Sequence, residues 1–389
     1  MSKQLTLIFN HFEVEHLGKD VFLVPFYLGR NLGYNVTIVY PLTETNKDFP
    51  TEIQGVKLVP IRFKKRLSWF PFWRTWNFYI YLLRNSSSID VLMRFHLSIH
   101  TLLMTIIYKI IHSKGAVYVK MDINPNSLLK EKDFKVTGFQ SWIKKCLYRT
   151  YTHKLDVCSC ETSLAYEYLK KMQNHHPLYN LGNKLLFIPN GFDEDLLRCL
   201  SIKEKSFAEK ENVMITVGRL GTPEKNTSML LEALKIVDLQ DWKFYLIGPM
   251  EANLKADIEK FYYHFPEKRN QVILTGPIYD KKELWEYYNR SKVFVLTSRW
   301  ESYALVLSEA QRFRNYILST NVGAFNDITE HGSKYGTSIN QEDVSDLVDK
   351  MNSIISNTIN IDVYDANFDT ALLSWKYKMH FVANALICK

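Results

Sequence analysis

Four charged side chains in the second half of the sequence have types and spacings that suit phosphate and sugar chemistry. Arg219 and Lys225 follow the apolar run VMITV, and Glu301 and Glu309 follow the run VFVL with seven residues between them. A guanidinium fork and an ammonium group suit a diphosphate, and a carboxylate accepts two hydrogen bonds from a ribose diol. We therefore interpret the cations as a diphosphate site, Glu309 as the ribose ligand and Glu301 as the group facing a donor sugar.

Backbone groups beside these side chains complete the interpretation. The residues after Glu301 begin a helix-like run, and N–H groups at a helix N-terminus bind anions. The turn after the run VILTG could present backbone groups to a base. The candidate substrate-binding residues are therefore Gly218, Pro277, Ile278, Ser302, Tyr303, Ala304 and Leu305.

Each feature taken alone also has a structural explanation. Glutamates eight positions apart occur by chance in most proteins, and Arg219 and Lys225 could be solvated surface cations. Pro277 and Ile278 could form an ordinary turn. The acidic triplet 193–195 matches a D-x-D metal motif, but we interpret it as the start of a helix, where acidic residues are favoured.

Short apolar runs alternate with helix-like runs in the second half. The expected strands are 213–220, 243–248, 271–276, 292–298 and 315–320, and the expected helices are 227–237, 252–264, 281–291, 304–313 and 343–355. Continuous apolar strands indicate a parallel sheet that is buried on both faces. Right-handed crossovers then give a doubly wound, Rossmann-like sheet. Glu309 is expected about two turns inside the helix 304–313.

The first half repeats this pattern less regularly, with expected strands at 4–10, 35–41, 56–61, 90–95, 116–122, 155–160 and 184–190. We therefore predict an α/β chain with two Rossmann-like, doubly wound parallel-sheet domains, 1–190 and 191–368, which face a cleft. Ligands of such sheets bind beyond the carboxyl ends of the strands, where the candidate residues lie.

The composition is that of a globular protein of 389 residues, with 46% apolar and 23% charged residues. The N-terminus lacks the features of a signal peptide, and no run reaches the ~18 apolar residues of a membrane span. The five cysteines contain no CxxC pair and the histidines no ligand set. We therefore expect a cytoplasmic protein without a metal site, which could also lie on the inner face of the cytoplasmic membrane.

Basic charge is concentrated in the first half. Residues 1–200 hold 26 Lys and Arg against 16 Asp and Glu, whereas residues 201–389 hold 23 against 25. Segment 62–84 combines three Trp, four Phe and two Tyr with six cations, and segment 142–154 adds more basic residues. This combination is typical of docking to an anionic membrane surface, although aromatic core packing with solvated cations is an alternative. No module typical of nucleic-acid binding surrounds these residues, so we expect no nucleic-acid partner.

The ordered motifs resemble the retaining GT-B glycosyltransferases of family 4, the glycosyl transferases group 1 with an E-x7-E motif. The matching segments are VGRL at 217–220, EKN at 224–226, FYLIGP at 244–249, VILTGPI at 272–278, VFVLTSRWESYALVLSEA at 293–310 and the hinge IPNGFD at 188–193. The resemblance implies an acceptor-binding first domain, a nucleotide-sugar-binding second domain and a final helix, 369–389, that crosses back to the first. It also implies catalytic roles for Arg219, Lys225 and Glu301, a ribose role for Glu309, and no metal or other cofactor.

The sequence departs from the family pattern at three places. Ser302 and Ala304 replace two glycines of the usual E-G-F-G loop, and only Gly18 remains of a Gly-Gly loop after the first strand. Asp122 stands where the family often has a histidine. Asp122 could orient or deprotonate an acceptor hydroxyl, or it could be a turn residue before Pro125.

The resemblance implies transfer of a sugar, with retention, from a nucleotide-sugar to a glycan hydroxyl. We expect a UDP-sugar donor and a lipid-linked acceptor in bacterial surface polysaccharide assembly, with lipopolysaccharide or capsule as the product. The alternative is a catalytically silent subunit that binds sugar nucleotides and stabilises a partner transferase. The changes at Ser302 and Ala304 would fit that alternative, whereas the retained Arg219, Lys225, Glu301 and Glu309 argue against it.

Overall fold

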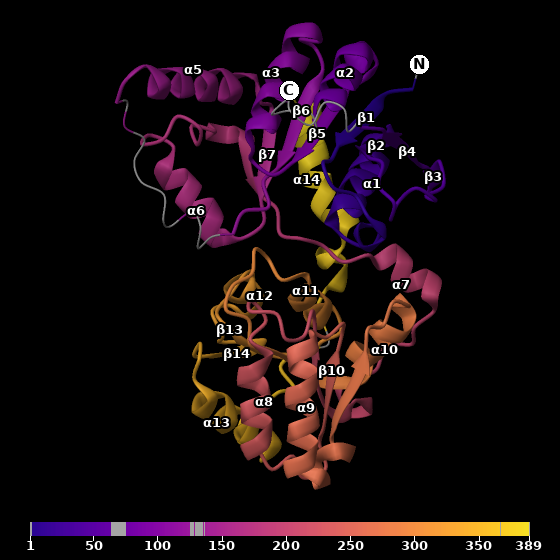
Figure 1. Cartoon of the computed structure of the whole chain (residues 1–389), viewed down its shortest axis with the longest axis vertical. Helices are drawn as coiled ribbons and strands as arrows, with labels where there is room; N and C mark the ends of the chain where they lie inside the picture. The colour runs from indigo at the N-terminus through magenta and orange to yellow at the C-terminus, as the bar shows by residue number, and fades with distance from the viewer. Residues whose placement is uncertain are drawn as a thin grey trace. The chain divides into compact units, whose positions relative to one another are not determined.

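The chain divides into two compact units, each with its own parallel sheet. The computed structural model describes residues 2–63, 75–124, 128, 135, 137–365 and 367–388. The first unit is Met1–Gly191 with Ser374–Lys389, and the second is Phe192–Leu373. The division therefore falls at Gly191–Phe192, and the segment that returns to the first unit begins at Ser374. Each unit is described by itself (Figure 1).

The described residues of the first unit form a sheet in the order β3-β4-β2-β1-β5-β6-β7-β8. All neighbouring strands are parallel except β3 and β4. The strands are β1 (Gln4–Ile8), β2 (Asn35–Pro41), β3 (Glu52–Ile53), β4 (Val56–Ile61), β5 (Val91–Phe95), β6 (Ala116–Lys120), β7 (Val157–Cys160) and β8 (Leu185–Phe187). The helices are α1 (Asp20–Leu32), α2 (Trp76–Asn85), α3 (Ile99–Ile111), α5 (Phe139–Lys154), α6 (Ser163–Met172) and α14 (Trp375–Ile387).

The second unit has a fully parallel sheet in the order β11-β10-β9-β12-β13-β14. Its strands are β9 (Glu211–Val217), β10 (Lys243–Ile247), β11 (Val272–Gly276), β12 (Ser291–Leu296), β13 (Tyr316–Thr320) and β14 (Gly336–Ile339). Its helices are α7 (Glu194–Leu200), α8 (Thr227–Ile236), α9 (Ala252–His264), α10 (Lys281–Arg290), α11 (Leu305–Arg312), α12 (Phe325–Thr329) and α13 (Val344–Ile355).

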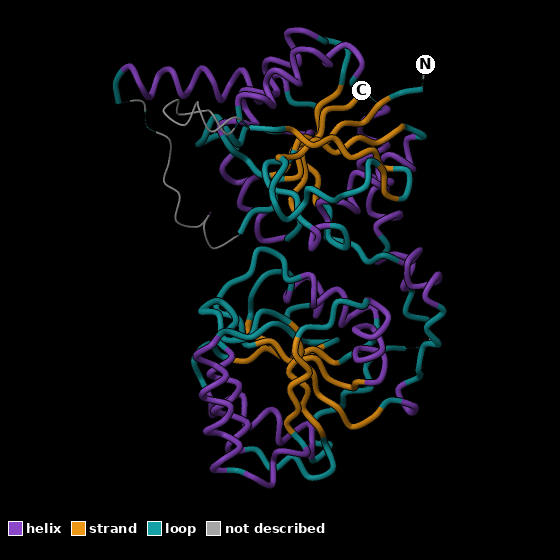
Figure 2. The backbone as a smooth tube through the Cα atoms, turned by 45° about the vertical axis from the view of Figure 1, so that its right-hand side comes forward, coloured by secondary structure: helices purple, strands orange, loops and turns teal. Residues whose placement is uncertain are grey.

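Helices cover both faces of each sheet, as Figure 2 shows. In β9, Met214 packs with α8, α9 and α13, whereas Val213 and Ile215 pack with α10 and α11 on the opposite face. This two-sided burial is why the strands read as continuous apolar runs. Side-chain caps at Asp280 and Asp343 begin α10 and α13, because each carboxylate accepts a hydrogen bond from an N–H of the first turn.

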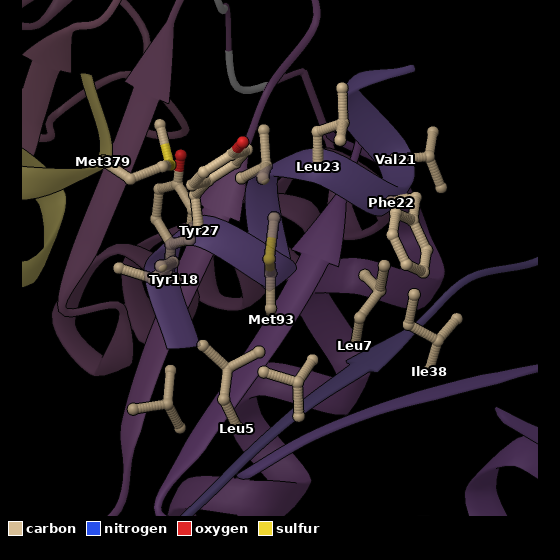
Figure 3. Close-up of a cluster of buried hydrophobic side chains, with 14 of the residues drawn as sticks. Leu5, Leu7, Val21, Phe22, Leu23, Tyr27, Ile38, Met93, Tyr118 and Met379 are labelled. Atoms are coloured by element: carbon tan, nitrogen blue, oxygen red, sulfur yellow. The ribbon is translucent and has the colours of Figure 1, made fainter. Parts of the chain in front are cut away.

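The C-terminal helix α14 packs in the first unit, against α1 and β7. Trp375, Met379, Val382 and Leu386 join the core that also holds Tyr27 of α1 and Tyr118 of β6. Figure 3 shows Met379 beside these two tyrosines. A Cβ on Gly191 would lie 2.6 Å from the backbone nitrogen of Trp375. The close packing of residue 191 against the start of α14 therefore needs a glycine at position 191.

In the part of the chain that the structure describes, no helix combines the length and the apolar character needed to cross a bilayer. Segment 64–74, the central part of the basic aromatic stretch, lies outside the described residues.

Candidate functional site

Lys225 and Glu301 form an ion pair at the carboxyl edge of the second sheet. β9 and β12 are parallel neighbours, so the residues that follow them meet at one edge. Lys225 Nζ lies 2.5 Å from Glu301 Oε1, and Ser298 Oγ donates to the same oxygen at 2.7 Å. Both charged side chains are mostly buried, at 16% and 14% exposure. The fold therefore fixes a cation and a carboxylate in one orientation where ligands of such sheets bind.

The loop that carries Lys225 is fastened to the end of β12. Thr297 Oγ1 donates to the backbone oxygens of Lys225 and Asn226 at 3.1 Å each. The Arg299 N–H donates to the Glu224 backbone oxygen at 2.7 Å. Asn226 has a left-handed φ of 47°, which asparagine tolerates better than most residues. These hydrogen bonds hold the loop in place.

Arg219 lies on the same loop and is mostly exposed. Its Nη2 donates to Glu224 Oε1 at 2.7 Å, while 70% of the Arg219 side chain remains accessible. Burial of Glu224 opposes ionisation, but hydrogen bonds and the charges of Arg219 and Lys225 keep its pKa below the ordinary value. One edge of the guanidinium fork is therefore anchored, and the exposed remainder can meet an anion.

Two glycines let β9 and β10 approach closely beside this loop. A Cβ on Gly248, whose φ is +139°, would lie only 1.9 Å from the Gly218 oxygen. A Cβ on Gly218 would lie 3.4 Å from Cε of Lys225. A Cβ at the predicted residue Gly218 would only come into van der Waals contact with the lysine, whereas Gly248, which the sequence analysis quoted only within FYLIGP, is needed for the close approach of the two strand ends.

The segment after Glu301 corrects one expectation. The helix begins at Leu305, not at residue 304, and Glu309 is its fifth residue, little more than one turn inside. The delay arises because Ala304 has a left-handed backbone, with φ of 68°, which cannot continue a helix. In the first turn of α11, the Leu307 N–H donates to the Ala304 oxygen at 2.9 Å, as is usual at a helix start.

Tyr303 and Ala304 are buried in the described structure. The Tyr303 hydroxyl accepts a hydrogen bond from Ser308 Oγ at 3.1 Å, and the Tyr303 backbone oxygen accepts one from the Ala324 N–H at 2.9 Å. Their part in substrate binding stays a prediction, and burial of the side chains means that it would have to come from the backbone. Ser302 is half-buried at the turn. Pro277 is exposed and Ile278 half-buried, directly after β11 at the same edge of the sheet.

Glu309 is held by one face of α10. Its Oε1 accepts hydrogen bonds from Lys281 Nζ at 2.9 Å and Trp285 Nε1 at 3.2 Å, and its Oε2 accepts one from the Tyr288 hydroxyl at 3.2 Å. Burial, and then the Glu309 charge, raise the pKa of Tyr288 well above its ordinary value, so its hydroxyl stays a donor. Lys281, Trp285 and Tyr288 recur at helical spacing, a signal that the sequence analysis did not use.

Asp122 and Gly18 belong to the first unit. Asp122 follows β6 with a left-handed φ of 44°, and its Oδ2 lies 3.6 Å from His96 Nδ1. Gly18 is exposed in the turn before α1. Their predicted roles toward acceptor and diphosphate stay predictions, because each unit is described by itself. Pro125, the turn partner proposed for Asp122, lies outside the described residues.

The acidic triplet begins a helix, as the sequence analysis predicted. Asp193 caps α7 by accepting a hydrogen bond from the Leu196 N–H at 3.1 Å. Among the described residues, no group of three or more His, Cys, Asp or Glu side chains is arranged to hold a metal ion. The independence of the reaction from metal ions stays a prediction.

Residues 198–367 match the family described as glycosyl transferases group 1. The chain is 29% identical to an uncharacterised 41.2 kDa protein in the cps region of Klebsiella pneumoniae. That alignment spans 160 residues and covers 41% of each chain. The chain is 39% identical to the amylovoran biosynthesis glycosyltransferase AmsD of Erwinia amylovora. That alignment spans 109 residues and covers 28% of each chain. The matches thus span well under half of these curated relatives.

Two solved structures resemble the whole chain. The lipopolysaccharide outer core galactosyltransferase WaaB in its apo form has a TM-score of 0.65 at 13% identity, covering 99% of both chains. HepE of Anabaena in complex with UDP has a TM-score of 0.60 at 13% identity, covering 99% of this chain and 96% of that one. The chain therefore has the GT-B fold of solved glycosyltransferases, and its match to glycosyl transferases group 1 lies within the second unit.

Proposed function

We propose that the protein is a retaining glycosyltransferase of family 4, which moves a sugar from a UDP-sugar to a hydroxyl of a lipid-linked glycan in bacterial surface polysaccharide assembly. The observation that carries the proposal is the buried contact between Lys225 and Glu301 beside Arg219, in a unit that matches glycosyl transferases group 1. The names of the relatives, from amylovoran biosynthesis, a cps region and lipopolysaccharide outer core, support the product class.

The proposed transfer depends on charge at the leaving group. Positive charge grows on the sugar and negative charge on the departing diphosphate. Arg219 and Lys225 would stabilise that diphosphate, and one well-placed donor of this kind contributes ~3–4 kcal/mol. Glu301 would bind the donor sugar and Glu309 the ribose. The donor phosphate would assist attack on the same face of the sugar, which gives retention without a covalent enzyme intermediate.

Lys225 and Glu301 must change partners for this to happen. In the structure, Glu301 Oε1 accepts hydrogen bonds from both Lys225 Nζ and Ser298 Oγ. A diphosphate oxygen beside Lys225 would compete with Glu301 for the ammonium group, and the released carboxylate could accept a sugar hydroxyl. The ion pair thus holds both groups at the edge of the sheet where the donor would bind.

A membrane-facing role is proposed for α5. Phe139, Trp142 and Ile143 on this helix are 72%, 54% and 46% exposed, and Lys144 and Lys145 follow them directly. Exposed aromatic and aliphatic side chains next to cations suit the interface of an anionic bilayer. A lipid-linked acceptor would be reached from such a surface.

The proposed function is tested by release of UDP or GDP from a panel of nucleotide-sugars, with EDTA present and without acceptor. We expect slow hydrolysis of one UDP-sugar, unaffected by EDTA and lost in Glu309→Ala. Calorimetry with UDP then separates the alternatives. Binding without turnover under any acceptor would favour the silent subunit, and no binding at all would contradict a donor site.

Membrane docking is tested by sedimentation with vesicles of anionic phospholipid at low salt. We expect the protein to pellet, and Trp142→Ser with Phe139→Ser to shift it to the supernatant. Tyr263→Ser is the matched control, because Tyr263 on α9 is 82% exposed but lies in the second unit. A wild-type protein that stays in the supernatant would contradict docking.

A further inference from the structure

A buried group of charged side chains surrounds Glu161 at the carboxyl edge of the first sheet. β6 and β7 are parallel neighbours, and their last residues, Lys120 and Cys160, are followed by Asp122 and Glu161. Asp20, the first residue of α1, completes the group through an ion pair of 3.0 Å between its Oδ2 and Lys120 Nζ. The sequence analysis used Asp122 but not its buried neighbours.

Glu161 has an unusual hydrogen-bonding environment. The residue is 1% exposed, and neither carboxyl oxygen has a hydrogen-bond donor among the described residues. The pairing of Lys120 with Ser159 leads Asp122 and Glu161 away from neighbouring strand ends, each two residues beyond the pair, and the two carboxyl groups interact electrostatically. Two ionised carboxylates only accept hydrogen bonds, so a hydrogen bond between these two groups needs a proton on one of them.

The surroundings decide which carboxyl keeps the proton. Burial raises the pKa of Glu161 well above its ordinary value, and the neighbouring Asp122 and Asp20 add to the shift despite Lys120. Burial acts in the same direction on Asp122, but Lys120, the contact with Glu161 and His96 outweigh it, so the pKa of Asp122 falls. The proton therefore belongs to Glu161, and Asp122 is the ionised partner.

Lys120 supplies the counter-charge for this arrangement. Burial alone would lower the pKa of Lys120, but nearby carboxylates raise it above the ordinary value: that of Glu161 when it is ionised, and those of Asp20 and Asp122. The ammonium group also lies 5.5 Å from the ring centre of Phe95. A fixed buried cation next to Asp122 keeps the ionised form of that aspartate stable.

Asp122 also needs conformational support. Its backbone φ is +44°, and that of the neighbouring His96 is +60°, so two residues other than glycine at this edge are left-handed. Such conformations persist only when the surroundings hold them. Only 28% of the Asp122 side chain is exposed, so the carboxylate has a limited set of directions open to a ligand.

We propose that Glu161 is a positioning residue, whose protonated carboxyl donates a hydrogen bond that holds Asp122 ionised and aimed at the acceptor hydroxyl. The inference rests on the proposed glycosyltransferase function and deepens it on the acceptor side. Asp122 would touch the acceptor, and Glu161 would act only through Asp122. The proton stays between the two carboxyl groups and no covalent step occurs.

The arrangement makes acceptor-dependent transfer sensitive to high pH. When Glu161 ionises, three carboxylates, those of Glu161, Asp122 and Asp20, face one ammonium group, the hydrogen bond is lost and Asp122 is repelled. The groups that face Glu161 from β6, β7, α1 and the loop after β6 are Lys120, Tyr118, Cys160, Asp20 and Asp122.

The direct test is infrared difference spectroscopy of the full-length protein as pH rises. We expect the carbonyl band of a buried, protonated carboxylic acid at neutral pH, its disappearance at high pH, and its absence in Glu161→Gln. Glu167→Gln, which removes an exposed glutamate on α6, should keep the band. A wild-type spectrum at neutral pH without the band would overturn the proposal.

The second test compares transfer to acceptor with donor hydrolysis. Glu161→Gln keeps a neutral hydrogen-bond donor, so we expect near-normal transfer at neutral pH and loss of the alkaline decline. Glu161→Ala should lower transfer about 10-fold, as expected for lost orientation, with unchanged UDP affinity by calorimetry and an unfolding temperature close to that of Glu161→Gln. An alkaline decline that persists in Glu161→Gln would contradict the inference. If the wild type transfers no sugar, the proposed function fails, and the infrared band alone decides the state of Glu161.

Discussion

The ion pair between Lys225 and Glu301 is the residue-scale feature that most directly bears on turnover. We predict that Lys225→Ala and Arg219→Ala each lower kcat on the order of 10²-fold, because each removes a cation aimed at the leaving diphosphate. Steady-state kinetics with the identified UDP-sugar provide the measurement. Lys243→Ala, an exposed lysine at the opposite end of the same sheet, is the control. Unchanged turnover in either site variant would refute its role.

The close approach of Gly248 to Gly218 gives a second residue-scale prediction. A Cβ on Gly248 would overlap the Gly218 oxygen, so Gly248→Ala must shift the loop that carries Arg219 and Lys225. We expect a loss of about 3 kcal/mol in unfolding free energy together with weaker UDP binding. Gly276→Ala is the control, because its φ of +74° adds strain of ~1 kcal/mol but its Cβ would have nothing within 4 Å. Equal losses in both variants would contradict the steric argument.

At this scale, the sequence predicted the groups of the site better than their partners. Lys225 and Glu301 follow strands whose carboxyl ends meet, so their proximity followed from the parallel sheet. The donors to Glu309 were not predicted, because Lys281, Trp285 and Tyr288 are meaningful only once α10 is known to face α11. Glu161 could not be assigned, because its pKa depends on burial that arises from the packed fold.

At the scale of elements, Ala304 sets where α11 begins. Its left-handed backbone is strained for any residue with a Cβ, by ~1–2 kcal/mol. We therefore predict that Ala304→Gly stabilises the protein by about 1 kcal/mol, less than the full strain because glycine also loses more entropy. Chemical denaturation measures the change. Ala310→Gly, inside the same helix, should instead destabilise by ~1 kcal/mol, and stabilisation by both changes would count against this account.

Lys210 ties together the ends of α10 and α11 in the second unit. Its Nζ donates to the backbone oxygens of Ser291 and Phe313 at 2.8 Å each and of Tyr288 at 3.3 Å. Burial, with help from Arg314 and Lys205, lowers the pKa of Lys210 to about 7. Between pH 7 and its unfolded value of about 10.4, the unfolded chain keeps a proton that the folded chain has lost, so stability rises with pH.

The measurement is the unfolding free energy of wild type and Lys210→Met between pH 6 and 9. We expect the difference between them to rise in favour of the wild type above pH 7, by at most about 1.4 kcal/mol per pH unit. A difference that is flat over this range would mean that Lys210 stays charged in the folded protein.

Strands that consist of a continuous apolar run could be predicted from the sequence, whereas strands that lack such a run could not. β9, β10, β12 and β13 follow the expected runs to within a few residues. β14, Gly336–Ile339, was missed because it has one large apolar side chain, and its place in the sheet comes from pairing with β13. The start of α11 was misplaced because a left-handed alanine has no signature in the sequence.

At the scale of the whole molecule, the first unit is built from two separate stretches of chain. We predict that truncation after Leu373 unfolds the first unit, because it removes Trp375, Met379, Val382 and Leu386 from a shared core. Each such side chain contributes ~1.5–3 kcal/mol through burial. Limited proteolysis should cleave within 1–191 while 192–373 survives and still binds UDP. Removal of residues 388–389 alone is the control, and a protease-resistant first unit after truncation would disprove the prediction.

Synthesis on the ribosome reverses the usual order for this chain. Domains generally fold from the N-terminus onward as they emerge, but the core of the first unit lacks α14 until residues 375–387 have left the exit tunnel. The second unit is complete by residue 373 and can fold while the first unit still lacks α14. The half that is translated first is therefore finished after the second unit, and nascent chains arrested before residues 375–387 leave the exit tunnel should show a protected second unit and an exposed face of α1.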